Sequence, residues 1–152
     1  MALVALCAVS ASRDIDSMAA ALTTYVITGC SGGLGLELVK QLATRGNKVY
    51  ATCRKKECSA TGTDHLSEAA KCGDVTIIEG VDVATDECKA VLAAALEGVT
   101  LDVVVHNAGG VNNDRTVKGM DTLAEQKLDV ITSAKMLETF QLNALGPLRV
   151  QQ

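Results

Sequence analysis

The stretch Thr24–Leu36, TYVITGCSGGLGL, decides the fold of this chain. Stiff, β-prone residues run directly into four glycines that fall within seven positions, at 29, 32, 33 and 35. Glycine inside a regular element costs about 0.5–1 kcal/mol relative to alanine, so a cluster of four needs a compensating role. The pattern predicts a buried strand over Thr24–Thr28, a glycine turn and then a helix.

The rest of the chain alternates between predicted strands and helices. The helix after the glycines carries Leu34, Leu38, Val39 and Leu42 on one face and is expected to end at Gly46. The further elements are predicted, in chain order, as strand 48–53, helix 64–71, strand 75–78, a helix capped by Thr85, strand 101–106, a polar loop from 109 to about 132, and a helix from about Ser133 that Pro147 breaks or kinks. Such alternation, with mostly short connections, predicts a parallel sheet with right-handed crossovers.

The composition fits one domain and argues against several classes of protein. The chain has 152 residues, 48% of them hydrophobic, which suits a single domain with an aliphatic core. The net charge is −4 and the largest basic block is Arg54-Lys55-Lys56, so a nucleic-acid-binding face is not indicated. No apolar run approaches the about 20 residues of a membrane span. The six cysteines form no CxxC pair and there are two histidines, so we expect reduced cysteines, no metal site and a cytoplasmic protein.

The first residues of the chain differ in character from the rest. The segment MALVALCAVSASR is briefly apolar but lacks a basic region in front of the apolar residues, so it makes a poor secretion signal. We interpret residues 1–20 as a poorly ordered N-terminal extension and residues 21–152 as the folded domain.

The position of the glycines indicates nucleotide binding. Ligands of open α/β sheets bind at the carboxyl ends of the strands. The start of a helix offers unpaired N–H groups and a partial positive charge, and glycine lets a phosphate approach the backbone. A tight turn without a ligand is the alternative. A P-loop would need Gly-Lys-Ser/Thr at the helix start, whereas here Gly35 is followed by Leu36 and Glu37.

The spacing Thr28-Gly29-x-x-x-Gly33-x-Gly35 resembles the TGxxxGxG motif of the short-chain dehydrogenase/reductase family rather than the ordinary G-x-G-x-x-G fingerprint. Three later segments are similar to motifs of that family and occur in the same order. They are Asp82-Val83, Asn107-Ala108-Gly109 with His106 in place of the family's first asparagine, and Asn143 with Gly146-Pro147. The segment VYATCRK and the glycine motif look most like the sniffer/C-factor group of carbonyl reductases.

The resemblance implies a Rossmann-like, doubly wound α/β sheet of strand order 3-2-1-4, truncated before the later strands. It also implies a set of cofactor-binding residues. These are Gly29, Cys30, Ser31, Gly32, Gly33, Leu34, Gly35, Arg54, Asp82, Val83, Asn107, Ala108 and Gly109. By resemblance Asp82 contacts the adenine, although it could simply cap the following helix. Asn107 is implied to join neighbouring strands beside the cofactor ribose, and a turn role alone is the alternative.

Arg54 favours NADP(H) over NAD(H) as the cofactor. NAD enzymes usually place an acidic residue near the end of the second strand to bind the ribose 2′-hydroxyl. Here that strand ends Thr52-Cys53-Arg54, and an arginine suits a 2′-phosphate through charge-assisted contacts. Lys55 and Lys56 add positive potential. Three solvated surface charges are the alternative interpretation.

The family's catalytic pattern is incomplete in this sequence. The resemblance implies a tyrosine whose pKa is lowered by a lysine four residues later, with an upstream serine. Tyr25 and Tyr50 lie in the first two predicted strands and are followed four residues later by Gly29 and Arg54. The chain stops at Gln152, before the segment expected to hold the serine and Tyr-x-x-x-Lys. Asn143 alone matches the family's active site, and it shares an apolar helical face with Met136 and Phe140, so core hydrogen bonding is its alternative role.

Two functions remain open at this point. The chain is the cofactor-binding part of an enzyme that, at full length, transfers hydride between NADP(H) and a carbonyl or alcohol substrate. Alternatively, it is a complete but non-catalytic nucleotide-binding or interaction module. In either case, the fourth strand would form an open edge of the sheet, so we expect the chain to self-associate through it.

Overall fold

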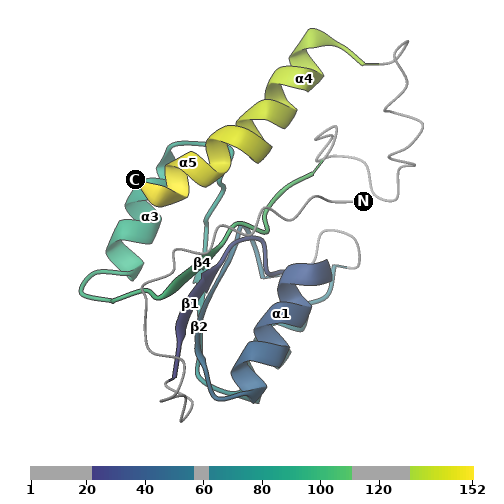
Figure 1. The fold of residues 1–152 in the computed structure, drawn as a ribbon. Helices are drawn as coiled ribbons and strands as arrows, with labels where there is room; N and C mark the ends of the chain where they lie inside the picture. Colours follow the sequence, from purple (N-terminus) through teal and green to yellow (C-terminus); the bar gives the residue numbers. More distant parts are fainter. Residues whose placement is uncertain (1–21, 57–61, 111–130) are drawn as a thin grey trace, which may run out of the picture.

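A computed structural model describes residues 22–56, 62–110 and 131–152, and all structural statements below concern these residues. Four parallel strands form one sheet of order β3-β2-β1-β4. They are β1 (Thr24–Ile27), β2 (Lys48–Cys53), β3 (Val75–Glu79) and β4 (Val103–Val105). Helices cover both faces of this sheet (Figure 1). The predicted doubly wound α/β fold and its strand order are therefore confirmed.

The helices follow the predicted order. They are α1 (Gly33–Thr44), α2 (His65–Ala69) with the 3-10 turn η2 (Ala70–Cys72), α3 (Glu87–Ala95), α4 (Ser133–Phe140), the π-helical turn η4 (Gln141–Leu145) and α5 (Gly146–Gln151). None of the helices in the described ranges is long and apolar enough to cross a membrane. The predicted N-terminal extension and most of the predicted polar loop fall on residues 1–21 and 111–130, outside the described residues.

The core lies in two layers, one on each face of the sheet, because successive strand residues point to opposite faces. On one face Ile27 and Val49 pack with Val39 of α1 and Leu66 of α2. On the other face the buried residues come from the strands, the loop after β3, α3 and η4. They are Val26, Tyr50, Ile78, Val81, Val83, Cys88, Leu92 and Leu142. Cover on both faces is what a parallel sheet requires.

The turn after α1 confirms the predicted role of Gly46. This residue has φ +84°, a left-handed conformation that favours glycine. Its N–H donates to the Ala43 carbonyl at 2.9 Å, and the Asn47 N–H donates to the Leu42 carbonyl at 3.1 Å. These two bonds form a Schellman motif, which satisfies the last carbonyls of α1 and returns the chain directly into β2.

Two local predictions about buried and capping residues are wrong. Leu34 was predicted to lie on the buried face of the first helix, yet it is 60% exposed. The face of α1 that packs on the sheet is centred on Gly35, Val39 and Ala43, so Leu34, about 100° around the helix from Gly35, turns outward. Thr85 was predicted to cap the following helix, but α3 begins at Glu87, one residue later than a Thr85 cap allows.

The final helix is not broken at Pro147; a break is one of the two outcomes that the sequence predicts, a break or a kink. The chain stays helical from Ser133 to Gln151, through α4, η4 and α5. A π-helical turn bonds i to i+5 and so shifts the hydrogen-bond register by one residue. Pro147 then takes a place in the first turn of α5, where the missing N–H and the fixed φ of proline are tolerated.

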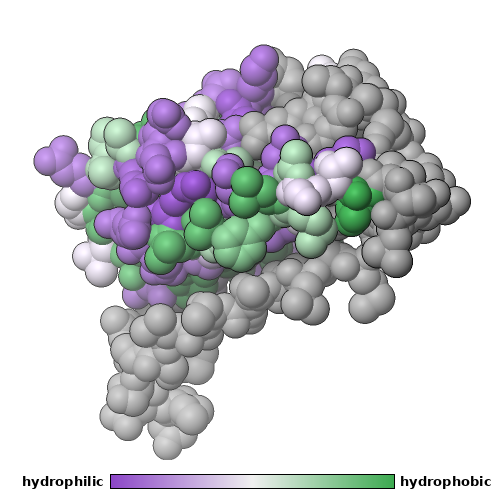
Figure 2. Space-filling view, turned by 90° about the horizontal axis from the view of Figure 1, so that it is seen from above, coloured by the Kyte–Doolittle hydropathy of each residue, from purple (hydrophilic) through white to green (hydrophobic). Residues whose placement is uncertain are grey.

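The outer side of α4 carries large apolar side chains. Met136, Leu137 and Phe140 are 54%, 58% and 55% exposed. Seen from above, the molecule presents a band of hydrophobic residues among hydrophilic ones (Figure 2). This exposure also corrects the idea that Asn143 lies on a buried apolar face with Met136 and Phe140, because these two residues and Asn143 itself are exposed. The extra residue of η4 changes the helical spacing on which that idea relied.

Candidate functional site

The glycine loop joins β1 to α1 at the carboxyl edge of the sheet and is packed tightly where two of its glycines lie. Gly29 has φ +74°, and a Cβ there would lie 2.9 Å from the Ala108 Cα. A Cβ on Gly35 would overlap the Gly29 carbonyl oxygen and lie 2.5 Å from Asn107 Nδ2. These two glycines therefore let the first turn of α1 and the segment after β4 approach the same loop.

Gly33 differs from Gly29 and Gly35 because it faces open space. It has φ +58°, and a Cβ there would meet nothing within 4 Å. Gly32, the N-cap of α1, is extended at φ −172° and supplies no side chain to the helix N–H groups. The first turn of α1 also contains no acidic residue. The unpaired N–H groups at the exposed start of this 12-residue helix are of the kind that favours an anion.

A hydrogen-bonded clamp ties the glycine loop to the end of β4. Asn107 Nδ2 donates to the carbonyls of Thr28 and Gly29, at 2.9 and 3.0 Å. In return, Thr28 Oγ1 accepts from the N–H groups of Asn107 and Ala108, at 3.1 and 3.0 Å. The predicted function of Asn107 as a link between neighbouring strands therefore has a geometric basis in these bonds.

Thr28 is the first residue of the glycine motif, and the structure gives its side chain a role that the sequence did not indicate. It is 1% exposed, and its hydroxyl is the centre of the clamp. A hydroxyl-bearing β-branched residue between a buried strand and a glycine turn was the available signal, because a buried hydroxyl needs hydrogen-bond partners.

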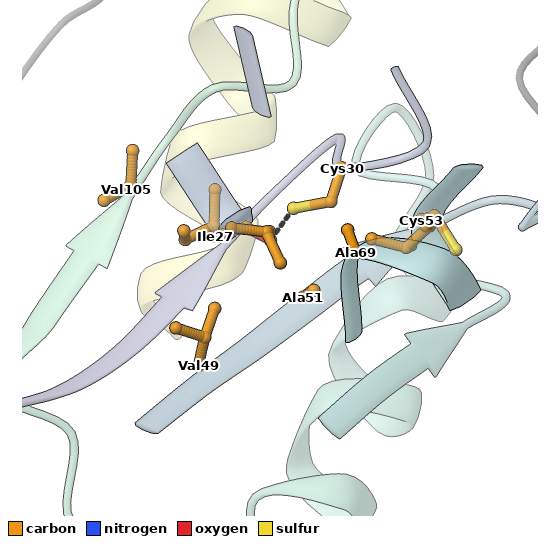
Figure 3. Close-up of a cluster of buried hydrophobic side chains, with 9 residues drawn as sticks. Ile27, Cys30, Val49, Ala51, Cys53, Ala69 and Val105 are labelled. Carbon is orange, nitrogen blue, oxygen red and sulfur yellow. Dashed lines mark hydrogen bonds between the residues drawn. The ribbon is translucent and has the colours of Figure 1, made fainter. Parts of the chain in front are cut away.

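Cys30 faces the protein interior and not the open side of the loop (Figure 3). Its N–H donates to the Thr52 carbonyl at 2.9 Å, and its thiol donates to the Ile27 carbonyl at 3.1 Å. Burial raises the pKa of the Cys30 thiol to about 12. Of the predicted loop residues, Cys30 thus holds the loop on β1 and β2, while Ser31 and Gly32 lie partly exposed before α1.

The segment after β3 places Asp82 and Val83 at the same edge. Asp82 Oδ1 accepts from the Ala84 N–H at 3.1 Å, and the Asp82 carbonyl accepts from the Thr85 N–H at 3.1 Å. Asp82 thus shapes the turn before α3, whose N-cap is Asp86. Val83 is buried, and a Cβ on Gly146 would lie 3.1 Å from its Cγ2.

The basic residues after β2 are placed as the sequence predicted, at the carboxyl end of that strand. Arg54 and Lys55 are exposed. The Arg54 carbonyl accepts from the Gly80 N–H at 3.3 Å, so the chain leaving β2 runs beside the chain leaving β3. An exposed guanidinium at this corner is available to a phosphate that approaches the carboxyl edge of the sheet.

Asn143 lies in η4 and is joined to the segment that follows β4. Its Oδ1 accepts from the Gly110 N–H at 3.0 Å, and its Nδ2 donates to the Gly110 carbonyl at 2.6 Å. A Cβ on Gly109 would lie 2.9 Å from Asn143 Oδ1, so the Asn143 amide and the chain at Gly109 lie close together. Both ends of the Asn143 amide are therefore occupied by the backbone of one glycine.

His106 connects the end of β4 to the end of α5. Its Nε2 accepts from Gln151 Nε2 at 3.0 Å, while Nδ1 is buried without a hydrogen-bond partner among the described residues. Burial lowers the pKa of the imidazole, which favours its neutral form. These contacts give His106 a structural role at the end of β4.

Metal-ligating groups do not gather at this edge. Within the described ranges, no three His, Cys, Asp or Glu side chains are placed to hold a metal ion. The two tyrosines of the chain lie in β1 and β2, and Tyr50 is buried. What the fold does bring together is the glycine loop, Asn107–Gly109, Asp82-Val83, Arg54 and Asn143, contributed by all four strand ends and η4.

Known proteins resemble this chain over most of its length. The family model described as short chain dehydrogenase matches residues 23–152. Retinol dehydrogenase 8 from Bos taurus is 34% identical over 93 residues, which cover 60% of this chain and 30% of that enzyme. The chain spans less than half the length of this and other curated relatives that it matches.

Solved structures show the same architecture. A short-chain dehydrogenase/reductase from Burkholderia multivorans with bound NADP has a TM-score of 0.67 and 26% identity, covering 86% of this chain and 51% of that one. The NADH-dependent reductase A1-R′ complexed with NAD has a TM-score of 0.62 and 24% identity, covering 86% of this chain and 49% of that one. This likeness shows the fold alone. The family model and the strand order agree: this chain belongs to the short-chain dehydrogenase/reductase family.

Proposed function

We propose that this chain is the dinucleotide-binding part of a short-chain dehydrogenase/reductase and that it prefers NADP(H) to NAD(H). The observation that carries this proposal is the glycine loop, held between β1 and β4 by the Thr28–Asn107 clamp with Gly33 facing open space. The order of the strands reverses between β1 and β4, and open α/β sheets bind ligands at such a point.

The placement of the residues suggests which part of the cofactor each would bind. The pyrophosphate lies at the start of α1, against the open side of Gly33, where the helix N–H groups and dipole favour an anion. Asp82 and Val83 bind the adenine at the end of β3. Asn107, Ala108 and Gly109 lie beside a ribose at the end of β4. Cys30 contributes by holding the loop, since its N–H and thiol are bonded inside the protein.

Arg54 is the residue proposed to select the 2′-phosphate. It is exposed at the end of β2, next to the chain that leaves β3 toward Asp82. A guanidinium can form two parallel hydrogen bonds to a phosphate, and Lys55 adds positive charge beside it. The NADP bound to the Burkholderia relative is in keeping with this preference.

Titration calorimetry with NADP⁺ and NAD⁺ tests the cofactor preference directly. Arg54→Ala should weaken NADP⁺ binding by about 1–3 kcal/mol, the range for a lost charged hydrogen bond, and change NAD⁺ binding much less. Arg45→Ala is the matched control, because Arg45 is exposed at the opposite end of α1. Equal losses for both cofactors would remove Arg54 from the 2′-phosphate role. No binding of either cofactor by the unaltered chain would overturn the proposed function.

The reaction of the full-length form is proposed from the family alone. It transfers hydride between NADP(H) and a carbonyl or alcohol substrate, and this chain contributes Asn143 as a residue that holds the segment after β4 in place. Neither Tyr25 nor Tyr50 has a lysine four residues later. The 152-residue chain alone is therefore expected to oxidise no NADPH with a panel of carbonyl compounds.

The alternative is a non-catalytic nucleotide-binding or interaction module. The coding sequence beyond Gln152 distinguishes the two functions, since a serine and Tyr-x-x-x-Lys there would support the reductase. If the purified chain oxidises NADPH steadily and the Gly33→Asp variant does so at the same rate, the activity comes from contaminating host reductases. Oxidation that Gly33→Asp abolishes would contradict the expectation of no turnover.

A further inference from the structure

The side chain of Arg149 reaches three different segments of the chain from α5. Its Nε donates to Asp86 Oδ1 at 3.0 Å. Its Nη1 donates to the Val83 carbonyl at 3.2 Å and to the Gln141 carbonyl at 3.1 Å. The side chain is 12% exposed, so these acceptors replace most of the water that a guanidinium would otherwise bind.

The three segments border the candidate site on two sides. Val83 and Asp86 belong to the chain between β3 and α3, and Gln141 belongs to the turn η4. Val83 is the residue after Asp82 in the proposed adenine-binding segment. Gln141 is the first residue of η4, the π-helical turn that holds Asn143. Asp86 is the N-cap of α3 and follows directly after the turn that Asp82 forms. A single guanidinium therefore bonds to backbone on both sides of the site, and Gly146 packs against Val83 between them.

We propose that Arg149 is a positioning residue of the dinucleotide site: by bonding the Val83 and Gln141 carbonyls together, it sets the Asp82-Val83 segment and the Asn143 turn relative to each other. This inference rests on the proposed function. The Gln141 carbonyl lies at the first residue of a π-helical turn, an irregularity that frequently occurs at functional sites.

The bonds to the two carbonyls matter more in this arrangement than the ion pair with Asp86. The Asp86 side chain is 71% exposed and is shared with Lys89, whose Nζ lies 3.2 Å from the same oxygen. Arg149 and then Lys89 lower the pKa of this carboxyl by hydrogen bonding, but an exposed ion pair contributes little to stability. Lys89→Met therefore serves as a control, because it removes one cation beside Asp86 and leaves both bonds from Arg149 to the carbonyls intact.

Lysine cannot replace arginine fully at position 149. A guanidinium presents several N–H groups in one plane, and here two of its nitrogens serve three acceptors. An ammonium group has one nitrogen, so it retains the charge but reaches fewer of these acceptors. Arg149→Lys is accordingly expected to fall between the wild type and Arg149→Met in every measurement below.

The experiment compares Arg149→Met, Arg149→Lys and Lys89→Met in the complete 152-residue chain. The first readout is amide hydrogen exchange without ligand, at Ala84 and Thr85 and at residues 143–146. The second is the affinity for adenosine 2′,5′-bisphosphate, the adenine end of NADP, by titration calorimetry. Amides of β1 report global unfolding. The exchange readout needs no cofactor, so it remains decisive for Arg149 even if the unaltered chain fails to bind the bisphosphate and the proposed function is wrong.

Arg149→Met should speed exchange about tenfold or more at both segments and weaken bisphosphate binding by about tenfold, while β1 stays protected. Lys89→Met should leave both readouts within about twofold of the wild type. Faster exchange at only one segment would overturn the coupling. So would a uniform rise that includes β1 in both Arg149 variants, because Arg149 would then be a general stability residue. If Arg149→Met does not fold, the same criteria apply to Arg149→Lys.

Discussion

At the scale of single residues, Asn107 holds the glycine loop through two hydrogen bonds that no other side chain supplies among the described residues. Both bonds end on backbone carbonyls, those of Thr28 and Gly29. Asn107 Nδ2 would lie 2.5 Å from a Cβ on Gly35, so the asparagine side chain can take this position only because residue 35 is glycine. A mutation here therefore tests whether the clamp stabilises the loop.

Asn107→Ala removes both donors and leaves two partly buried carbonyls without this partner. We expect the free energy of unfolding in urea to fall by about 1–3 kcal/mol. Gln41→Ala is the control, because the Gln41 amide bonds only an exposed carboxylate, that of Glu37. A loss for Asn107→Ala as small as the control's, within about 0.5 kcal/mol, would show that the clamp contributes nothing to stability.

The buried thiol of Cys30 predicts a pH dependence. Burial raises its pKa in the folded protein from 9.0 to about 12. Above about pH 9, the unfolded chain then releases a proton that the folded chain keeps, so stability falls as the pH rises. Between about pH 8 and 10, the free energy of unfolding of the wild type should fall by about 1.4 kcal/mol more than that of Cys30→Ala. Parallel curves for the two proteins would contradict the buried, protonated thiol.

At the scale of secondary-structure elements, two glycines at the start of α1 have different roles. Gly35 is needed for close packing, since a Cβ there would overlap the Gly29 carbonyl oxygen. Gly33 has a left-handed φ of +58° but open space around it. The two positions should therefore respond differently to the same substitution.

Gly35→Ala should push α1 away from the loop and lower the free energy of unfolding by about 2 kcal/mol or more, because the overlap is with backbone. Gly33→Ala should cost about 1 kcal/mol, from backbone strain alone. Thermal unfolding of the two variants beside the wild type measures this difference. A smaller loss for Gly35→Ala than for Gly33→Ala would contradict the packing described for α1.

Elements with strong local signals could be predicted from the sequence. The strand-glycine-helix unit and the end of α1 at Gly46 were predictable because glycine and apolar periodicity act locally. The outward position of Leu34 was not, since it depends on which face of α1 packs on the sheet. The contacts of Arg149 with Val83 and Asp86 join residues far apart in the sequence. Periodicity cannot reveal such contacts.

At the scale of the whole molecule, two surfaces favour association. In the described sheet β4 pairs with β1 and has no strand on its other side. The outer side of α4 also exposes Met136, Leu137 and Phe140. Unpaired strand edges and apolar patches both promote contact between chains.

The 152-residue chain is therefore expected to self-associate through the β4 edge. Sedimentation velocity should show a mass that rises with protein concentration, and amides of β4 should exchange faster than those of β1 in the dilute chain. A monodisperse monomer at high concentration, with β4 protected as well as β1, would contradict this prediction.

The central claim is that the carboxyl edge of the sheet binds a dinucleotide, and amide hydrogen exchange with and without NADP⁺ tests it most directly. Bound NADP⁺ should protect residues 31–36, 82–84 and 107–109, and leave Thr24, Lys48 and Val75 at the opposite ends of the strands unchanged. Gly33→Asp, which places a negative charge at the proposed pyrophosphate position, should abolish this protection. No protection at saturating NADP⁺, or protection confined to the opposite edge, would contradict the account.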